Sequence, residues 1–481
     1  MITFLVSLAL LVLGYFTYGK FIERMFGVKE GRSTPAYTHR DGVDYLPMSE
    51  RKNSLIQLLN IAGVGPIFGP IMGALYGPVA FIWIVAGCIF AGAVHDYLTG
   101  MISIRNRGAH LPELAGRFLG KAMKHVVNAF AILLLVLVGT VFVTSPADLL
   151  FNLMDGWMGI GVITGLIFAY YILATLLPID KIIGRFYPIF GALLIISAVG
   201  VGISLVVTGA PIPELTLTNM HPDNLPIFPL LFLTISCGAL SGFHATQTPI
   251  ISRTTENEKQ GRRIFYGMMI AEGMIAMIWA AAAMSLFQGP AGLNELLANG
   301  GPAAVVSEAS VLSLGAIGGT LTILGVIVLP ITSGDTAFRS ARMIIADYLN
   351  VGQAKISSRL WIALPLFVIS YALTKIDFNI LWRYFSWANQ STAVIALWVA
   401  SVYLFVAGKN YFVAMIPAVF MTMATMTYIL NAQIGFNLPL NTSYYAGAVI
   451  TAVLTVLFFK RARRAKRNKL PLEEVPGRPA A

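Results

Sequence analysis

The sequence contains few charged residues. Only 11% of its 481 residues are Asp, Glu, Lys or Arg, whereas 57% are hydrophobic, and soluble domains carry about 25% charged residues. This composition excludes a soluble protein built on one large core. Apolar runs of roughly 17–25 residues, the length that crosses a hydrocarbon layer of about 30 Å, recur along the chain. The sequence therefore predicts an all-α polytopic membrane protein.

Sequence motifs for metal, redox or nucleotide chemistry are also absent. The chain has two cysteines, Cys88 and Cys237, which are too few for a disulfide framework and lie in apolar segments. We interpret both as small buried hydrophobic residues. No CxxC, HExxH or Walker-type motif occurs. We therefore expect no cofactor and no resident metal, and the pattern argues against an enzyme and against ATP-driven transport by this chain alone.

About 13 transmembrane helices are expected from the apolar runs. They lie near residues 2–19, 54–76, 79–104, 125–146, 157–177, 186–208, 226–249, 264–287, 311–338, 358–374, 380–407, 410–430 and 444–460. Basic residues gather in the loops that follow odd-numbered spans, with Lys375 as the exception. Since basic loops stay cytoplasmic, we expect the N-terminus outside and the C-terminus in the cytoplasm. The basic tail at residues 460–469 then faces anionic lipid headgroups, which accounts for the net charge of +11. Nucleic acid is not an expected partner.

The second span contains unusually strong helix breakers. Residues 63–70 read GVGPIFGP, and in a helix interior glycine costs about 1 kcal/mol and proline about 3 kcal/mol relative to alanine. Irregular backbone at membrane depth persists only where protein or a water-filled cavity satisfies it. We predict that this span is broken and that Gly63, Gly65, Pro66 and Gly69 line a substrate site. Close helix packing through small residues is the alternative interpretation.

The seventh span shows the same features. Residues 236–249 read SCGALSGFHATQTP, so that Ser241, His244 and Gln247 lie in or beside a second predicted break. The two spans run in opposite directions, which is typical of inverted-repeat secondary transporters whose half-helix ends bind solute or ion. His244 can bind a carboxylate or titrate near neutral pH, or it can be a packed histidine. Thr140 of the fourth span is a further candidate substrate ligand.

These breaks predict a LeuT-like five-plus-five inverted repeat with discontinuous helices and with extra helices at both ends. The expected parts are an N-terminal helix and basic loop (1–53), a first repeat (54–208), a second repeat (226–407), two accessory helices (410–460) and a basic tail (461–481).

The ninth span ends in VLPITSGDTAFRSAR (328–342), in which we expect Pro330 and Gly334 to loosen the helix. In five-plus-five transporters that resemble the LeuT type, a hydroxyl pair on this helix and carbonyls of the first broken helix hold sodium. The matching groups here are Thr332 and Ser333 with the carbonyls of Ala62 and Val64. Asp335 could instead carry a proton, because burial favours its neutral form, or it could form an ion pair with Arg339 one turn away.

Three more ionisable residues lie within spans and are functional candidates on that ground. His95 and Asp96 are neighbours in the third span, so we expect their side chains to leave the helix about 100° apart and not to line one face together. Glu272 in the eighth span requires a partner that the sequence does not identify.

Three long motifs carry a family resemblance. They are LLNIAGVGPIFGPIMGALYGP (58–78), GAVHDYLTGMISIRNRGAHLPELAGRFLG (92–120) and SGFHATQTPIISR (241–253). These stretches resemble the carbon starvation protein A (CstA) family over most of the chain. The resemblance implies a bacterial inner-membrane nutrient transporter that is related to peptide transporters and to pyruvate/proton symporters.

We therefore expect a secondary active importer that works by alternating access. Its substrate would be a small peptide or a small carboxylate such as pyruvate, and a proton or sodium gradient would drive it. A cation-selective channel or a membrane nutrient sensor is the alternative. The polar residues within the spans are too sparse for a continuous channel lining, and no signalling domain is attached.

Overall fold

The computed structural model of the chain describes residues 1–42, 44–154, 156–176, 179–353 and 355–473, and it is almost wholly helical. Nine of the described helices are long and apolar enough to cross a membrane, or ten if one bent pair counts as a single span. This result confirms an all-helical membrane protein. The count of 13 spans stays a prediction, because α10 (Ile160–Leu176), the apolar stretch 191–207 of α11 (Ile179–Val207) and the pair α12–α13 fall short of this length.

The remaining helices coincide with the predicted spans to within several residues, except in the ninth span, where the helix extends well beyond residues 311–338 at both ends. They are α1 (Ile2–Phe16), α2 (Tyr18–Phe26), α4 (Glu50–Ala62), α5 (Gly65–Gly73), α6 (Val79–Gly87), α7 (Ala93–Arg105), α9 (Lys121–Leu153), α12 (Ile227–Thr234), α13 (Gly242–Ser252), α14 (Met268–Leu286), α15 (Pro290–Leu349), α16 (Ile356–Leu373), α17 (Phe378–Val406), α18 (Phe412–Asn431) and α19 (Leu440–Arg467). Two short helices, α3 (Pro35–Thr38) and α8 (Leu111–Phe118), lie in the basic loops.

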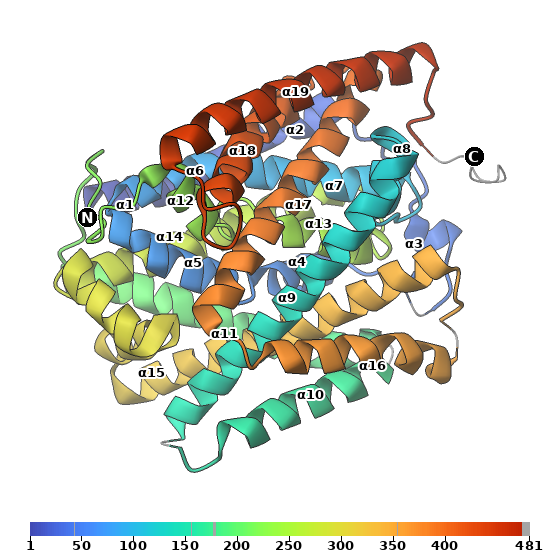
Figure 1. The fold of residues 1–481 in the computed structure, drawn as a ribbon. Coiled ribbons are helices and arrows are strands. Elements are labelled where there is room, and N and C mark those ends of the chain that lie inside the picture. Colours follow the sequence, from blue (N-terminus) through green and yellow to red (C-terminus); the bar gives the residue numbers. More distant parts are fainter. Residues whose placement is uncertain (43, 155, 177–178, 354, 474–481) are drawn as a thin grey trace.

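The outer helices carry the apolar surface that a bilayer requires. On α19, Val449, Val453 and Leu457 are each at least half exposed, which would be costly in water but suits hydrocarbon. In Figure 1, α1 begins at the left edge of the molecule and α19 ends at the right edge. In this view the helical part of the chain thus starts and finishes at opposite ends of the bundle.

Both predicted breaks are present. Helix α4 ends at Ala62 and α5 begins at Gly65, with a bend of 47° between them. In the seventh span, residues 235–241 separate α12 from α13. Every residue of α13 is buried, and so is every residue of α5 except Met72. The irregular backbone therefore lies inside the protein, where neighbouring helices can satisfy its polar groups.

The two breaks also lie against each other. A Cβ atom added to Gly65 would collide with the Cys237 side chain, and one added to Gly69 would lie 2.9 Å from the carbonyl oxygen of Thr234. The glycines of the second span therefore permit close packing as well as the break, and that they line a substrate site stays a prediction.

The expected loosening of the ninth span at Pro330 and Gly334 is wrong. Helix α15 is non-helical only at Gly301 and Gly315, before the predicted span and within its first turns, and it continues regularly past Pro330. The absence of a side chain at Gly334 has another role: a Cβ atom there would overlap the Tyr171 hydroxyl of α10. This glycine serves helix packing.

Gly242, the first residue of α13, provides a test of this packing. A Cβ atom there would meet the backbone of α17 at Asn389 and Ala393. Because backbone cannot rotate away, we expect Gly242→Ala to lower the free energy of unfolding by about 1–3 kcal/mol or more. Thermal unfolding in detergent would measure this loss. Gly165→Ala on α10, where a Cβ atom meets nothing within 4 Å, is the control and should leave the stability unchanged or slightly higher.

Candidate functional site

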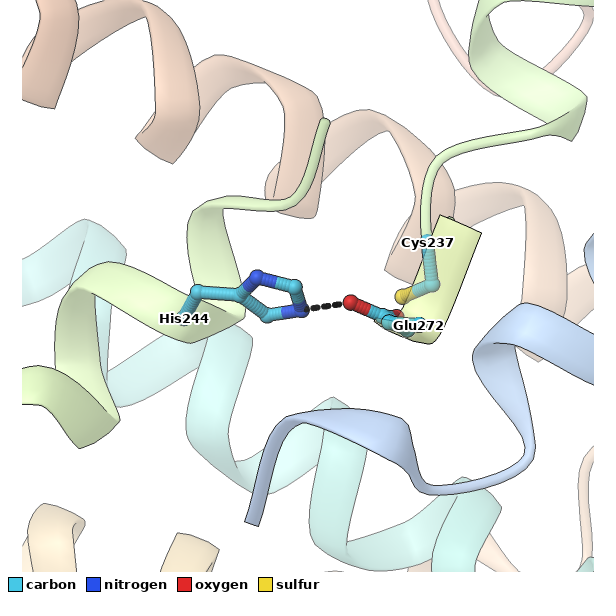
Figure 2. Close-up of side chains that lie close together, drawn as sticks. All are labelled: Cys237, His244 and Glu272. Carbon is cyan, nitrogen blue, oxygen red and sulfur yellow. Dashed lines mark ion pairs between the residues drawn. The ribbon is translucent and has the colours of Figure 1, made fainter. Parts of the chain in front are cut away.

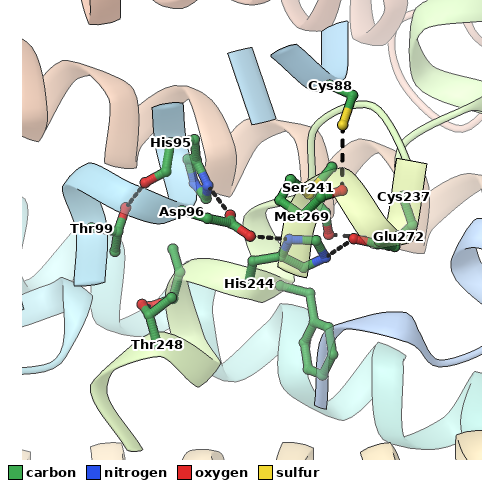
Figure 3. Close-up of polar contacts among 12 residues, drawn as sticks. Cys88, His95, Asp96, Thr99, Cys237, Ser241, His244, Thr248, Met269 and Glu272 are labelled. Atoms are coloured by element: carbon green, nitrogen blue, oxygen red, sulfur yellow. Dashed lines mark hydrogen bonds and ion pairs between the residues drawn. The ribbon is translucent and has the colours of Figure 1, made fainter. Parts of the chain in front are cut away.

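A cluster of ionisable side chains surrounds the break in the seventh span. His244, in the first turn of α13, lies between two carboxylates from other helices. Its Nδ1 is 2.9 Å from Oδ2 of Asp96 on α7, and its Nε2 is 3.3 Å from Oε2 of Glu272 on α14. All three side chains are fully buried. Figure 2 shows the His244–Glu272 contact, and Figure 3 shows the wider chain of polar contacts.

The structure corrects the expectation for His95 and Asp96. Although they are sequence neighbours, His95 Nδ1 lies 2.8 Å from Oδ1 of Asp96, and both side chains are fully buried. A divergence of about 100° on a helix does not prevent two long side chains from bending toward each other. Asp96 thus accepts from His95 with one oxygen and from His244 with the other.

Glu272, for which the sequence offered no partner, has two. Besides His244, its Oε1 accepts a hydrogen bond of 3.2 Å from the backbone N–H of Gly238, within the break. The carboxylate therefore satisfies a backbone group that the interrupted helix leaves free.

Asn389 of α17 stabilises the beginning of α13. Its Oδ1 accepts from the backbone N–H of Phe243 at 2.7 Å and from the Ser241 hydroxyl at 3.1 Å. An exposed helix uses its own N-cap side chain for this purpose, whereas here the acceptor comes from a distant helix. Ser241 is thus occupied by protein in this conformation.

The groups predicted to bind a cation make other contacts in this conformation. Ser333 of α15 donates to a carbonyl of the first broken helix, at 2.7 Å, but the acceptor is Leu59. The carbonyl of Val64 instead accepts from Ile67 and Phe68 at the start of α5. The Thr332 hydroxyl bonds to Leu329 of its own helix. Ser333 therefore joins α15 to α4 about one helical turn before the predicted Ala62, and cation binding here stays a prediction.

Asp335 is buried, with 1% of its surface exposed. Arg339, one turn along α15, has its Nη2 3.8 Å from Oδ2 of Asp335. Neither carboxylate oxygen accepts a hydrogen bond from the described residues. The predicted ion pair is present, but it is loose and lies inside the protein.

Thr140 and Gln247, the two other predicted substrate ligands, differ in their contacts. The Thr140 hydroxyl donates to Val136 of α9 and contacts Ser370 of α16 at 2.9 Å, so it joins two helices. Gln247 donates to Thr246, while its fully buried Oε1 has no hydrogen bond within the described chain.

A charged vestibule opens at the far end of α13. Its cavity of about 770 Å³ is lined by residues that include Arg107, His110, Arg253 and Asp347. Arg253 follows directly after α13, so the vestibule lies one length of this helix, about 15 Å, from His244. Burial, together with the charge of Arg253, holds the pKa of His110 well below its usual value, so this histidine does not add positive charge near neutral pH.

Two residues of the site were not among the predicted ligands. Cys237 was interpreted as a hydrophobic residue, yet its sulfur lies 3.4 Å from the Ser241 hydroxyl inside the break. Its neighbours Ser236 and Gly238, which belong to the predicted break, were the sequence feature that could have placed Cys237 in the site. The role of Asn389 depends on α17 lying beside α13, and no local pattern shows that contact.

The fold has counterparts among solved transporters. The structure of MhsT in complex with L-phenylalanine superposes with a TM-score of 0.57 at 12% identity, covering 86% of this chain and 99% of the other. A manganese transporter variant from Eremococcus coleocola gives a TM-score of 0.56 at 13% identity, covering 86% and 94%. The protein is thus a polytopic membrane protein with the fold of these transporters.

The chain belongs to the CstA family. The family model described as carbon starvation protein CstA matches residues 1–163, 150–317 and 285–428. An uncharacterised membrane protein of Haemophilus influenzae is 49% identical over 62% of this chain and 95% of its own length. The peptide transporter CstA of Escherichia coli is 25% identical over 89% and 81% of the two chains. The pyruvate/proton symporter BtsT of the same organism is 27% identical over 61% and 51%.

Replacement of Asn389 tests how far the site depends on α17. In Asn389→Ala, the Phe243 N–H and the Ser241 hydroxyl lose their acceptor inside the protein, which should lower the free energy of unfolding by about 1–3 kcal/mol. Ser401→Ala on the same helix removes only a hydroxyl that bonds to its own turn, at Leu397. We expect a clear drop in melting temperature for the first variant and little change for the second. Equal melting temperatures would show that the break is held by other contacts.

Proposed function

We propose that the protein is a secondary active importer of small peptides or of a small carboxylate such as pyruvate, driven by a proton or sodium gradient. The observation that carries the proposal is the contact between two interrupted helices, where Gly65 and Gly69 lie against the segment 234–237. Half-helix ends at the centre of a membrane protein are the sites where secondary transporters bind solutes and ions. The named relatives, a peptide transporter and a pyruvate/proton symporter, support the same class of substrate.

The solute site in this proposal lies between the two breaks. The start of α13 carries the positive end of a helix dipole, which favours the carboxylate that peptides and pyruvate share. Gln247 and Asn60 point unsatisfied polar atoms into the fully buried interior. A buried polar group without a partner costs about 1–3 kcal/mol, so a bound solute or water would offset this cost.

The proposal includes a topology. Residues 54–208 and 226–407 form the two inverted repeats, with the N-terminus outside, the C-terminus in the cytoplasm and the protein in the bacterial inner membrane. The vestibule at the end of α13 is then the cytoplasmic exit. Movement of α13 against α7 and α14 would open or close the route between the breaks and this vestibule.

Two places could bind the coupling ion. The contact of Ser333 with the Leu59 carbonyl brings together oxygen atoms suited to sodium. Asp335 is suited to a proton, because a carboxylate in a buried site without hydrogen bonds is costly when charged. The charged and titratable groups that face Asp335 are Arg339 and Arg342 of its own helix and Tyr170 and Tyr171 of α10.

Uptake by the purified protein in liposomes tests the function. We expect saturable accumulation of labelled pyruvate or of a labelled dipeptide when a proton or sodium gradient is imposed, because a carrier couples the two movements. Liposomes without protein, and liposomes with dissipated gradients, are the controls. Ion current that does not depend on solute would favour a channel and contradict the proposal.

Asp335→Asn tests the proton pathway separately. An amide cannot ionise, so proton-driven accumulation should be lost, while exchange of labelled for unlabelled solute at equal pH should persist. Glu308→Gln, an exposed carboxylate on the same helix, is the matched control and should transport normally. Full proton coupling in Asp335→Asn would remove Asp335 from the mechanism.

A further inference from the structure

Three side chains around the second break form a set of possible metal ligands. Cys237 comes from the interrupted segment, His244 from the first turn of α13 and Glu272 from the second turn of α14. Their donor atoms, Sγ, an imidazole nitrogen and a carboxylate oxygen, lie within 4.8 Å of one another. Figure 2 shows the three side chains converging on a common point from separate elements.

The three side chains are buried, and two of their donor atoms lack hydrogen bonds. The exposed fraction is 2% for Cys237 and zero for His244 and Glu272. Neither Nε2 of His244 nor Oε2 of Glu272 makes a hydrogen bond within the described part of the chain. The two atoms lie 3.3 Å apart as an ion pair without a hydrogen bond. Because buried polar atoms normally make hydrogen bonds, a cation shared between them would satisfy both.

The outer contacts orient the ligands for a metal ion. Nδ1 of His244 donates to Asp96 at 2.9 Å, which leaves the lone pair of Nε2 directed at Glu272 and Cys237. Metal-binding histidines almost always donate their other nitrogen to a carboxylate or carbonyl in this way. The second oxygen of Glu272 accepts from the Gly238 N–H. Figure 3 shows the contacts of His244 with Asp96 and Glu272.

The charges agree with a divalent ion. Asp96 and Glu272 are both buried and flank a single imidazole, and one imidazolium cannot neutralise two carboxylates. His95 contacts only the Asp96 side of the cluster. An unbalanced charge inside a protein is costly. A divalent cation beside a neutral His244 would offset both carboxylates, and with Cys237 bound as a thiolate the cluster would carry no more net charge than it does with an imidazolium.

We propose that Cys237, His244 and Glu272 bind one divalent transition-metal ion of the zinc type. Thiolate and imidazole ligands favour such ions over calcium or magnesium. Typical bonds of about 2.0–2.3 Å to S, N and O require only small movements of these side chains. Three protein ligands leave one tetrahedral position open to water or solute. The thiol releases its proton on binding, so affinity should rise with pH.

Such an ion would connect the break to both α13 and α14. Cys237 lies within the interrupted segment 235–241 and His244 lies in the first turn of α13, so the ion would hold this segment against the two helices. The proposal concerns ion binding and does not depend on the nature of the transported solute.

Cobalt(II) is a suitable probe, because cysteine ligation gives a thiolate-to-cobalt charge-transfer band. The chain has only two cysteines, so the source of any band can be assigned. Purified, chelator-treated protein in detergent should bind one Co²⁺ with this band, and Zn²⁺ should displace it. Cys237→Ser should abolish the band. Cys88→Ser is the matched control, because Cys88 is also buried but donates to the Met269 carbonyl; it should retain the band.

Two further variants test the other parts of the site. Glu272→Gln should greatly weaken binding, and Asp96→Asn, which alters only the orienting contact, should weaken it about 10–100-fold. Each variant is compared only if it elutes as a single species and melts cooperatively. A band that persists in Cys237→Ser, or wild-type protein that shows no saturable Co²⁺ binding with a thiolate band, would overturn the proposal.

Discussion

Each interruption of a helix inside this protein requires other parts of the chain to satisfy its backbone. In hydrocarbon, a free N–H or C=O group has no water to bond to. The second break meets this constraint with side chains from distant helices: Glu272 accepts from Gly238, and Asn389 accepts from Phe243. The first break lies against the second, with glycines at the points of contact. The candidate site exists because these breaks are covered.

The same contacts explain why ionisable residues are concentrated there. A carboxylate that satisfies the backbone at a break is necessarily buried, and a buried carboxylate requires a partner. Glu272 has His244, and His244 in turn has Asp96. Satisfying the backbone at the break thus leads to a chain of polar contacts that runs from α14 through α13 to α7, inside a largely apolar bundle.

Much of the fold could be predicted from the sequence, whereas the site could be predicted only in part. Apolar length and helix breakers act locally, so the helices and both breaks were predictable, and His244, Ser333 and Asp335 were recognised as rare polar groups in apolar runs. The partners were not predictable. The sequence did not indicate that Glu272 meets His244, that the carbonyl bonded to Ser333 belongs to Leu59, or that Pro330 leaves α15 regular. Each of these depends on contacts between residues far apart in the chain.

By itself, the sequence determined that the chain enters a membrane, where its helices lie and which two of them are interrupted, because hydrophobicity and the conformational limits of glycine and proline act over a few residues. The tertiary structure decided which interrupted ends meet and which donors face one another. Cys237 illustrates the difference: in the sequence it is a small apolar residue, and only the approach of α13 and α14 places its sulfur beside an imidazole and a carboxylate. Such an approach is set by the packing of the whole bundle.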